Sequence, residues 1–383
     1  MAHLQSTAIL ARLRTFTISP TRDYTGDLLR VHTPSYVNTV LQSCQDTDRG
    51  RDIRQQLSQH GDVFITPDTA EAALMAAAAA VELTEHILDG DSGIQRAFSL
   101  CRPPGHHADM SSAKGFCIFN NIAVAAALSL DTHHLSRVAV VDWDIHHGNG
   151  CQDIFEADPR VLHISVHKHV YRSVEGEVAQ AGEGAMAGCV GVGEGRGYNV
   201  NVPLGAGKAG GGMGDADYAA VFEHIVLPVL QEFNPEMVFI AAGFDAGVGD
   251  VSLPIGGYSV SPEGFGMMST ALRHCAGEAG RGRILACLEG GYNTPGLCLS
   301  VEAVIRSMLE PATVEAGAHG LIHGNAGTGE EGGQYTPEYS PAAERAVASW
   351  LRCGEGCDPD TKRVIEEVKA ELQPFWTCFQ RIG

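Results

Sequence analysis

The sequence predicts an α/β fold, with residues 1–383 forming a single large domain around a mostly parallel central sheet that carries helices on both faces. Three observations support this prediction. Short apolar runs rich in β-branched residues alternate along the chain with longer segments of helical period, the order typical of parallel sheets. The length of 383 residues and the 44% hydrophobic content allow a substantial core. Several apolar runs also end directly in reactive polar residues, as strands do at ligand sites.

The expected elements follow in this order. Strands are predicted at 97–101, from Val138, at 161–166, 198–203, 237–242 and 284–288. Helices are predicted at 35–44, 71–88, 120–130, 217–233 with an interruption at Pro228, 262–278, from about Leu297, 342–351 and 360–372. The stretches 168–197 and 205–214 are glycine-rich and predicted to be loops, the first a mobile surface segment. Residues 311–340 are predicted to be a further loop, and 341–383 to be closing helices.

Charge and cysteine content limit the classes of function that are expected for the chain. The formal charge of -20 argues against nucleic-acid binding, which depends on basic patches, and would suit a cationic partner such as a basic peptide tail. The 11 cysteines are scattered, and no signal peptide is evident, so reduced thiols in the nucleus or cytoplasm are expected. No apolar stretch is suited to crossing a membrane.

The stretch from Val138 to Gly150 carries the strongest chemical signal. Asp142, Asp144 and His146 alternate after the apolar run, so an extended backbone would point them to the same side. A salt-bridged strand end with a helix cap is the simpler explanation for one such acid. Two acids, two histidines and two glycines within nine residues favour a metal site instead.

Other reactive residues follow other predicted strands. His106 and His107, Asp245, and Tyr292 each come after an apolar run, and the carboxyl ends of parallel strands lie at one edge of a sheet. Asp144, His146 and Asp245 would together supply three ligands to a metal ion and leave one coordination position open. This ligand set suits zinc, and iron(II) fits it as well.

The remaining residues fit the hydrolysis of an amide. His106 and His107 would act as general acid and base, with Asp142 orienting one imidazole and favouring its charged form. Tyr292 would hydrogen-bond the developing oxyanion. A packing role explains His106-His107 equally well in isolation, and the shared sheet edge favours catalysis.

Several runs together resemble the zinc-dependent histone deacetylases of the class II type, which have the arginase–deacetylase fold. The matching runs occur in the family's order and cover roughly residues 30–310. They are Arg-Pro-Pro-Gly-His-His at 102–107, Gly-Phe-Cys-Ile-Phe-Asn-Asn at 115–121, Asp-Trp-Asp-Ile-His-His-Gly-Asn-Gly at 142–150, Asp-Pro-Arg-Val at 158–161, Ile-Ser-Val-His at 164–167, Asn-Val-Asn-Val-Pro at 199–203, Ala-Gly-Phe-Asp-Ala at 242–246 and Leu-Glu-Gly-Gly-Tyr at 288–292.

The resemblance implies roles for individual residues. Asp144, His146 and Asp245 would ligate zinc, His107 would lie nearer the leaving amine, and Tyr292 would be the oxyanion tyrosine. Gly115 and Phe116 would line the channel for the acyl-lysine stem. Two structural potassium sites are implied, the first at Asp142, Asp144, His146, Ser165 and Val166, and the second at Phe155, Asp158, Val161 and Tyr198.

The chain also departs from the family pattern. Asn149 gives His107 a neutral partner, as is usual in class II. The second channel wall should follow the strand at 161–166, but 168–176 matches poorly, which leaves Tyr171, Val174 or neither as that wall. Where polyamine-preferring relatives carry a gate glutamate, this chain offers the apolar Leu253 or Ile255.

The main expectation is therefore a deacetylase acting on acetylated lysine in a peptide or protein, histone or not. An acetylpolyamine or small-amine amidohydrolase of the same fold is the first alternative, which the apolar gate disfavours. A manganese ureohydrolase would need more carboxylates than the run at 142–150 offers. A non-catalytic acyl-lysine reader or scaffold in a multiprotein complex is the alternative from another class, and the intact Tyr292 and ligand set disfavour it.

Overall fold

A computed structural model describes residues 1–18, 22–45, 47–58, 62–172, 178–180, 182–205, 213–250, 258–276, 282–309 and 341–380. Besides the channel-wall candidate Val174, three predictions fall on residues outside these ranges. They are the loop at 311–340, most of the glycine-rich loop at 205–214, and the gate position at Leu253 or Ile255.

The fold is built on a sheet of six strands in the order β1-β8-β7-β2-β3-β6, and all neighbouring strands run parallel. The predicted α/β class is thereby confirmed. Asp142, the last residue of the central strand β2, pairs in register with Ser165 of β3 and Ala241 of β7. The carboxyl ends of the central strands therefore lie at one edge. The strands are β1 (Arg96–Ser99), β2 (Val138–Asp142), β3 (Val161–Lys168), β6 (Asn199–Leu204), β7 (Met237–Ala242) and β8 (Ile284–Leu288).

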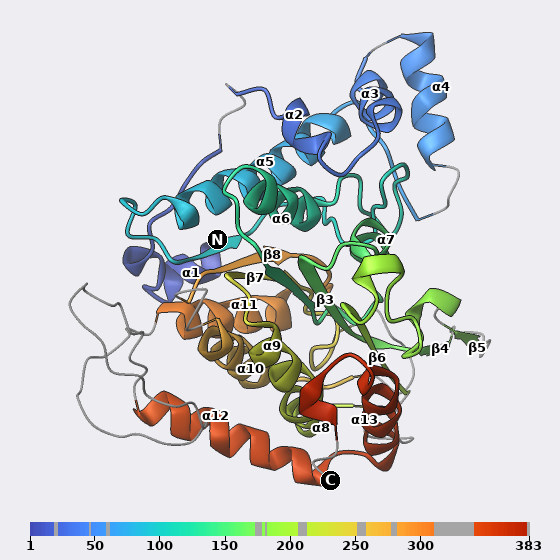
Figure 1. Ribbon diagram of the computed structural model, residues 1–383. Coiled ribbons are helices and arrows are strands. Elements are labelled where there is room, and N and C mark those ends of the chain that lie inside the picture. The colour runs from blue at the N-terminus through green and yellow to red at the C-terminus, as the bar shows by residue number, and fades with distance from the viewer. Residues whose placement is uncertain are drawn as a thin grey trace.

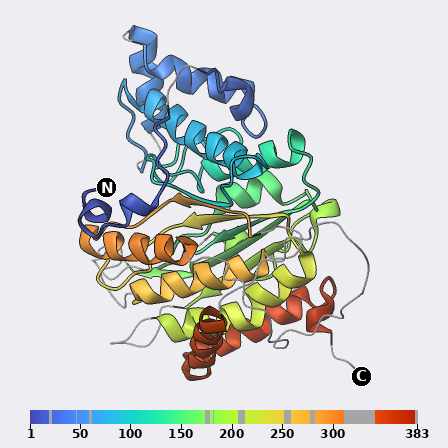
Figure 2. The same cartoon turned by 90° about the vertical axis from the view of Figure 1, so that its left-hand side faces the viewer.

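Helices cover both faces of this sheet, as Figures 1 and 2 show. One face carries α5 (Thr69–Leu88) and α6 (Asn121–Asp131). The other carries α8 (Asp215–Val221), α9 (Leu227–Phe233), α10 (Pro262–Cys275) and α11 (Thr294–Leu309). Alternate side chains of each strand point to opposite faces, so the sheet separates two apolar cores. Within β2, Val138 and Val140 pack with α5 and α6, whereas Ala139 and Val141 belong to the core beneath.

The remaining elements surround this framework. Helix α12 (Pro341–Cys353) packs on the outside of α8, and α13 (Pro359–Leu372) packs against the edge strand β6 and α8 (Figure 1). The amino-terminal part adds α1 (Ala2–Ser6), α2 (Thr25–Leu28), α3 (Pro34–Ser43) and α4 (Asp48–Leu57). Helix α7 (Asn149–Phe155) begins directly after the motif at 142–148. Helices α1, α2, α4 and α7 were not predicted from the sequence, because each is short or weakly apolar.

The stretch 168–197 corrects a prediction. It was expected to be a mobile surface loop, but β4 (Val170–Arg172) and β5 (Val178–Gln180) form an antiparallel pair, and Ala185, Ala187 and Val190 are buried. The reason lies in β6, where the side chains of Asn199 and Asn201 donate to the carbonyl oxygens of Cys189 and Gly184 at 2.5 and 2.9 Å. These bonds attach an otherwise patternless segment to the sheet.

The helix predicted at 217–233 is interrupted, as expected from Pro228. A π-helical turn, Phe222–Val226, separates α8 from α9. Proline cannot donate the hydrogen bond that a continuous α-helix requires, which accounts for an irregular turn at this point.

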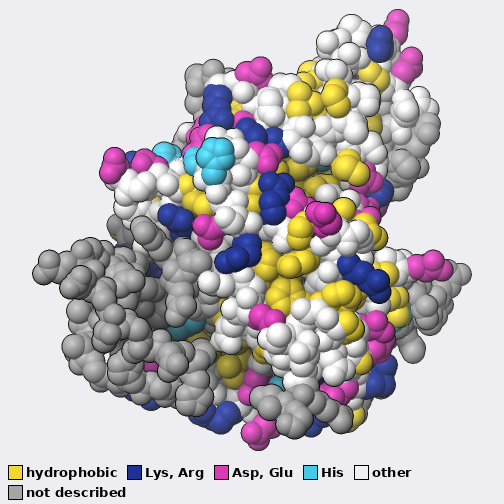
Figure 3. Space-filling model, in the orientation of Figure 1, with side chains coloured by type: hydrophobic (Ala, Val, Ile, Leu, Met, Phe, Trp, Pro, Cys, Tyr) yellow, Lys and Arg dark blue, Asp and Glu magenta, His cyan; other side chains and the backbone are white. Residues whose placement is uncertain are grey.

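Neither the described helices nor the face in Figure 3 indicates a membrane span or a large patch of like charge. No helix in the described part of the chain is long and apolar enough to cross a bilayer. On the face drawn in Figure 3, acidic and basic side chains are interspersed among polar and apolar ones. That distribution lacks the continuous basic surface of nucleic-acid-binding proteins.

Candidate active site

The reactive residues after β2 are held by a local turn. The strand ends at Asp142, not beyond it, and side-chain oxygens replace the strand's hydrogen bonds. Asp142 Oδ1 accepts from the amide of Asp144 at 3.0 Å, and Asp144 Oδ1 accepts from the amide of His146 at 2.8 Å. Asp245, which follows β7, accepts from the amide of Ile145 at 3.0 Å. Aspartate side chains often compete with regular structure in this way.

This turn brings Asp144, His146 and Asp245 together, with their candidate ligand atoms all within 4.8 Å of one another. The His146 Nδ1 atom lies 3.0 Å from both Asp144 Oδ1 and Asp245 Oδ2. The two carboxylates are only 1% and 2% exposed. Burial and the nearby Asp144 charge raise the pKa of Asp245 to about 6, a repulsion that a bound cation would relieve. Two carboxylates and one imidazole are a donor set that divalent zinc or iron accepts.

The tandem histidines lie beside this group in two different environments. The Nδ1 atom of His106 is 2.8 Å from Asp142 Oδ2, whereas the Nδ1 atom of His107 is 2.7 Å from the amide oxygen of Asn149. Their ring centroids are 4.0 Å apart.

The pKa values of the two imidazoles shift in opposite directions. Burial disfavours the charged form of His106, but the Asp142 and Asp144 carboxylates outweigh it and raise its pKa to about 10. Burial and the His106 charge lower the pKa of His107 to about 3. One ring is therefore held protonated and the other neutral, which is how paired acid–base groups are commonly differentiated.

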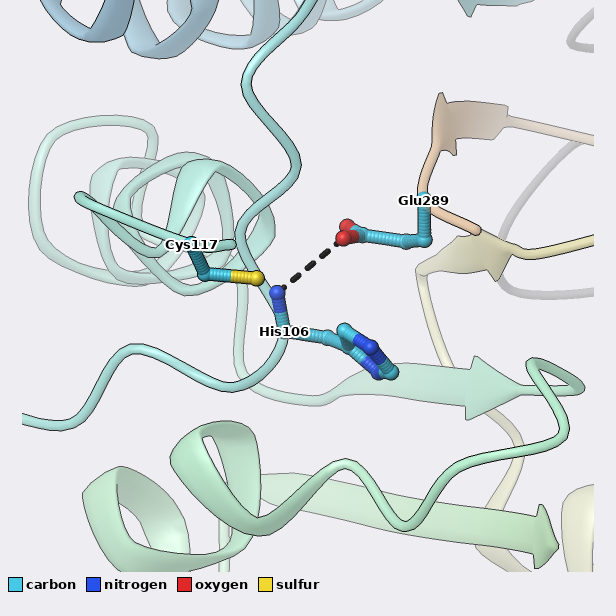
Figure 4. Close-up of side chains that lie close together, drawn as sticks. All are labelled: His106, Cys117 and Glu289. Atoms are coloured by element: carbon cyan, nitrogen blue, oxygen red, sulfur yellow. Dashed lines mark hydrogen bonds between the residues drawn. The ribbon is translucent and has the colours of Figure 1, made fainter. Parts of the chain in front are cut away.

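Glu289 holds the backbone of the loop that carries His106, as the dashed bond in Figure 4 shows. Its Oε2 atom accepts from the backbone amides of Gly105 at 2.7 Å and His106 at 3.1 Å. Figure 4 shows the His106 ring pointing away from Cys117 and Glu289, although the candidate ligand atoms of these three residues lie within 4.8 Å. Because the His106 ring faces Asp142 instead, we assign Glu289 to holding the loop rather than to a second metal site.

One wall beside the pair is a tight turn. The amides and carbonyls of Lys114 and Cys117 hydrogen-bond each other at 3.2 and 2.8 Å across Gly115 and Phe116, which have φ values of +53° and +65°. A Cβ atom on Gly115 would lie 2.2 Å from the His107 ring, so the turn packs directly on that histidine. Phe116 is 54% exposed, and its ring centroid lies 6.3 Å from that of Tyr292.

Tyr292 follows β8, and its ring lies beside that of Phe116. Burial, together with the charges of Asp144 and Asp245, raises the pKa of its hydroxyl well above the ordinary value. The hydroxyl therefore stays protonated at neutral pH and can donate a hydrogen bond.

The residues predicted to bind potassium lie on neighbouring elements. Asp142 and Ser165 are paired across β2 and β3, and Val166 follows Ser165 in β3. Phe155 ends α7, and its carbonyl accepts from the amide of Asp158 at 2.9 Å. Val161 begins β3, and the Tyr198 carbonyl accepts from the amide of His163 at 2.9 Å. The second-wall candidates Tyr171 and Val174 lie outside the described side chains.

Three supporting residues were missed by the sequence analysis: Glu289, Asp62 and Asp250. Glu289 directly follows β8, much as Asp142 ends β2. Its position at the end of a predicted strand could therefore have indicated a role in the site. Asp62 and Asp250 act through contacts distant in sequence, with the backbone of residues 115–116 and 292–293 respectively. No local pattern marks such contacts.

A six-stranded parallel sheet with this cluster at its carboxyl edge defines an α/β protein of the arginase–deacetylase fold. The model of the histone deacetylase domain matches residues 1–308. The chain therefore belongs to the histone deacetylase family, as the sequence resemblance indicated.

Curated relatives agree with this assignment. The chain is 40% identical to histone deacetylase 5 of Arabidopsis thaliana over 290 residues, which are 74% of this chain and 41% of that protein. It is 39% identical to histone deacetylase 18 of the same plant over 357 residues, which are 90% of this chain and 43% of that protein. It is 38% identical to the human polyamine deacetylase HDAC10 over 284 residues, 74% of this chain and 40% of that protein. The chain thus spans less than half the length of these relatives.

Proposed function

We propose that this protein is a zinc-dependent lysine deacetylase that hydrolyses the amide of Nε-acetyl-lysine in a peptide or protein. The observation that carries the proposal is the pair of adjacent imidazoles, one held charged by Asp142 and one kept neutral beside Asn149, next to a buried three-ligand group. A site built only for packing would have no need of two neighbouring histidines with opposite protonation.

In this proposal Asp144, His146 and Asp245 hold the divalent ion. Zinc is the first choice, and iron(II) also suits these ligands. The ion, when bound, supplies Lewis acidity toward the amide carbonyl and lowers the pKa of a water molecule.

The protein's own residues handle the protons and the developing charge. His107, being neutral, accepts the proton of the attacking water and returns it to the leaving nitrogen. His106, kept protonated by Asp142, supplies positive charge beside the reacting carbon. Tyr292 donates a hydrogen bond to the carbonyl oxygen as negative charge develops there.

Binding of the substrate and of structural ions completes the proposal. Gly115 and Phe116 form one wall for the apolar stem of the acyl-lysine. Structural potassium would be held at Asp142, Asp144, His146, Ser165 and Val166, mainly through backbone oxygens, and at Phe155, Asp158, Val161 and Tyr198. Nuclear or cytoplasmic residence, a role in chromatin and transcription, and membership of a multiprotein complex belong to the same proposal.

Acetylpolyamines are the second candidate substrate class, because human HDAC10, one of the relatives, is named a polyamine deacetylase. The protein's charge of -20 also suits a polycationic substrate. The apolar Leu253 and Ile255 favour the peptide substrate on sequence grounds.

The test is to compare the turnover of an acetyl-lysine peptide and of N8-acetylspermidine by the zinc-loaded protein. A hydroxamate chelator and a Tyr292→Phe variant serve as controls. Preferred turnover of the peptide, abolished by chelator and lowered in the variant, is the expected result. Preferred turnover of acetylspermidine would instead assign the protein to the acetylpolyamine deacetylases. No turnover of either substrate by the zinc-bound protein would contradict the deacetylase proposal.

A further inference from the structure

The backbone at Tyr292 is held by hydrogen bonds on both sides of a glycine with a positive φ. On one side, the amide of Gly290 donates to Asp144 Oδ2 at 2.8 Å, and its carbonyl accepts from the amide of Phe244 at 2.9 Å. Gly291 then has a φ of +125°, a conformation that residues with a side chain rarely adopt. The chain is therefore hydrogen-bonded up to Gly290, and at Gly291 no side chain of its own restricts the backbone.

The second anchor is Asp250. Its Oδ2 atom accepts from the amides of Tyr292 at 2.6 Å and Asn293 at 2.9 Å, and the Asn293 side chain donates to the Gly249 carbonyl at 2.8 Å. The next residue, Thr294, begins α11. Residues 249–250 thus hold the backbone between Gly291 and the start of α11.

Backbone hydrogen bonds also hold residues 246–250, the segment that ends at Asp250. The amide of Asp250 donates to the Gly247 carbonyl at 3.1 Å. The amides of Val248 and Val260 donate to the carbonyls of Val260 and Ala246 at 3.0 and 3.1 Å. Because Asp245 lies in the same turn, one short segment supplies a candidate metal ligand and the carboxylate that holds Tyr292.

We infer that Asp250 is a positioning residue that sets the reach of the Tyr292 hydroxyl toward the reacting carbonyl. The inference rests on the proposed deacetylase function. Without the Asp250 carboxylate, rotation at Gly291 lets Tyr292 leave its place opposite Phe116, although the metal group and the histidine pair stay assembled. Capping of α11 alone would predict a change in stability but no selective change in the chemical step.

The kinetic test is a double-mutant cycle between Asp250→Ala and Tyr292→Phe on the zinc-loaded protein. Asp250→Ala should lower kcat roughly tenfold or more with little change in KM, because an oxyanion contact made in the transition state is lost. Added to Tyr292→Phe, it should have almost no further effect. Asp250→Asn, which keeps a side-chain oxygen acceptor, should restore most of kcat. Independent, additive losses would overturn the inference, as would an unchanged kcat.

A matched control exists at the other edge of the sheet. Glu232 also accepts from two successive amides, those of Thr377 and Cys378, each at 2.8 Å. It lines a cavity of about 470 Å³ together with Arg137, the residue before β2. Glu232→Ala should leave kcat unchanged.

A second measurement does not depend on activity. With 3,5-difluorotyrosine at position 292, the fluorine NMR spectrum should show one narrow resonance in the parent protein, and a shifted, broadened or split one in Asp250→Ala. An inactive protein that still gives this change would refute the proposed function and support the positioning role. An identical resonance in both proteins would overturn the positioning role whatever the activity. Should Asp250→Ala not fold, Asp250→Glu moves the carboxylate by one methylene and should give the same spectral change.

Discussion

The two neighbouring histidines differ through one hydrogen-bond partner each, and that difference can be tested residue by residue. His107 faces the neutral Asn149 at 2.7 Å. An Asn149→Asp variant would place a negative charge there and raise the pKa of His107 by about 1–3 units. A base with a higher pKa stays protonated to higher pH, so the acidic limb of the pH profile of kcat/KM should move to higher pH. The pH profile of kcat/KM measures this shift directly.

A neutral replacement, Asn149→Ser, is the control for loss of the amide. It should lower activity without moving the acidic limb upward. If the limb of Asn149→Asp stayed in place while the protein remained folded, His107 would not be the base.

Gly290 shows how closely the backbone approaches the candidate metal group. A Cβ atom there would lie 2.4 Å from Asp245 Oδ2 and 2.6 Å from Asp144 Oδ2. Gly290→Ala should therefore displace both carboxylates and weaken zinc binding about 10–100-fold, the usual effect of disturbing groups that support metal ligands. Titration of the metal-free protein with zinc measures the change.

Gly26→Ala provides the comparison, because nothing lies within 4 Å of a Cβ atom at that position in α2. It should bind zinc as the parent does. Equal zinc affinity in Gly290→Ala would contradict the assignment of Asp144 and Asp245 as ligands.

Among the individual elements, the turn at Gly115 and Phe116 depends on a residue far away in sequence. Asp62 accepts from the Gly115 amide through its side chain at 3.0 Å and from the Phe116 amide through its carbonyl at 3.2 Å. Phe116 has a positive φ, which is unfavourable for a residue with a side chain, so these bonds help to hold a strained turn. Asp62→Ala should loosen this wall and raise KM for the peptide roughly five- to tenfold, equivalent to about 1 kcal/mol.

The matched control is Asp23→Ala, which also removes an acceptor from a backbone amide, that of Thr25, at 2.9 Å. Steady-state kinetics of both variants should show a raised KM only for Asp62→Ala. Equal KM values in the two variants would mean that the turn keeps its shape without Asp62.

The elements also show where sequence reasoning works and where it does not. Apolar runs located all six strands of the parallel sheet, and the shared edge brought Asp144, His146 and Asp245 together as predicted. The alternation argument extended β2 past Asp142, however, because the aspartate side chains that accept backbone amides there leave no trace in hydrophobic periodicity. Segment 182–197 was missed for a related reason, since asparagines of β6 attach it from a distance.

Across the whole molecule, several histidines are buried in the neutral form. Burial lowers the pKa of His32, His163 and His274 to about 4 each. The Asn120 amide donates to His32 Nε2 at 2.9 Å, a bond that requires this ring nitrogen to be unprotonated. These residues lie in an amino-terminal loop, in β3 and in α10, so they link the stability of all layers to pH.

The direction of this pH effect follows from the pKa of these histidines, which is 6.5 in the unfolded chain and about 4 in the folded protein. Between pH 4 and 6.5 the unfolded chain binds more protons at these histidines than the folded protein does, so their contribution to stability falls as pH falls. Glu289 acts in the opposite direction, because burial raises its pKa to about 7 and protonation favours the folded state. The pH dependence of the free energy of unfolding therefore combines contributions of opposite sign. A variant is needed to measure the contribution of a single histidine.

His32→Gln isolates one such histidine. The glutamine oxygen can still accept from the Asn120 amide, but it does not titrate. A histidine whose pKa falls from 6.5 to about 4 on folding costs about 2 kcal/mol of stability between pH 7 and pH 5. Urea unfolding at these two pH values should therefore show a stability loss about 2 kcal/mol smaller in His32→Gln than in the parent. Equal losses would mean that His32 is protonated in the folded protein, and that burial does not control its charge.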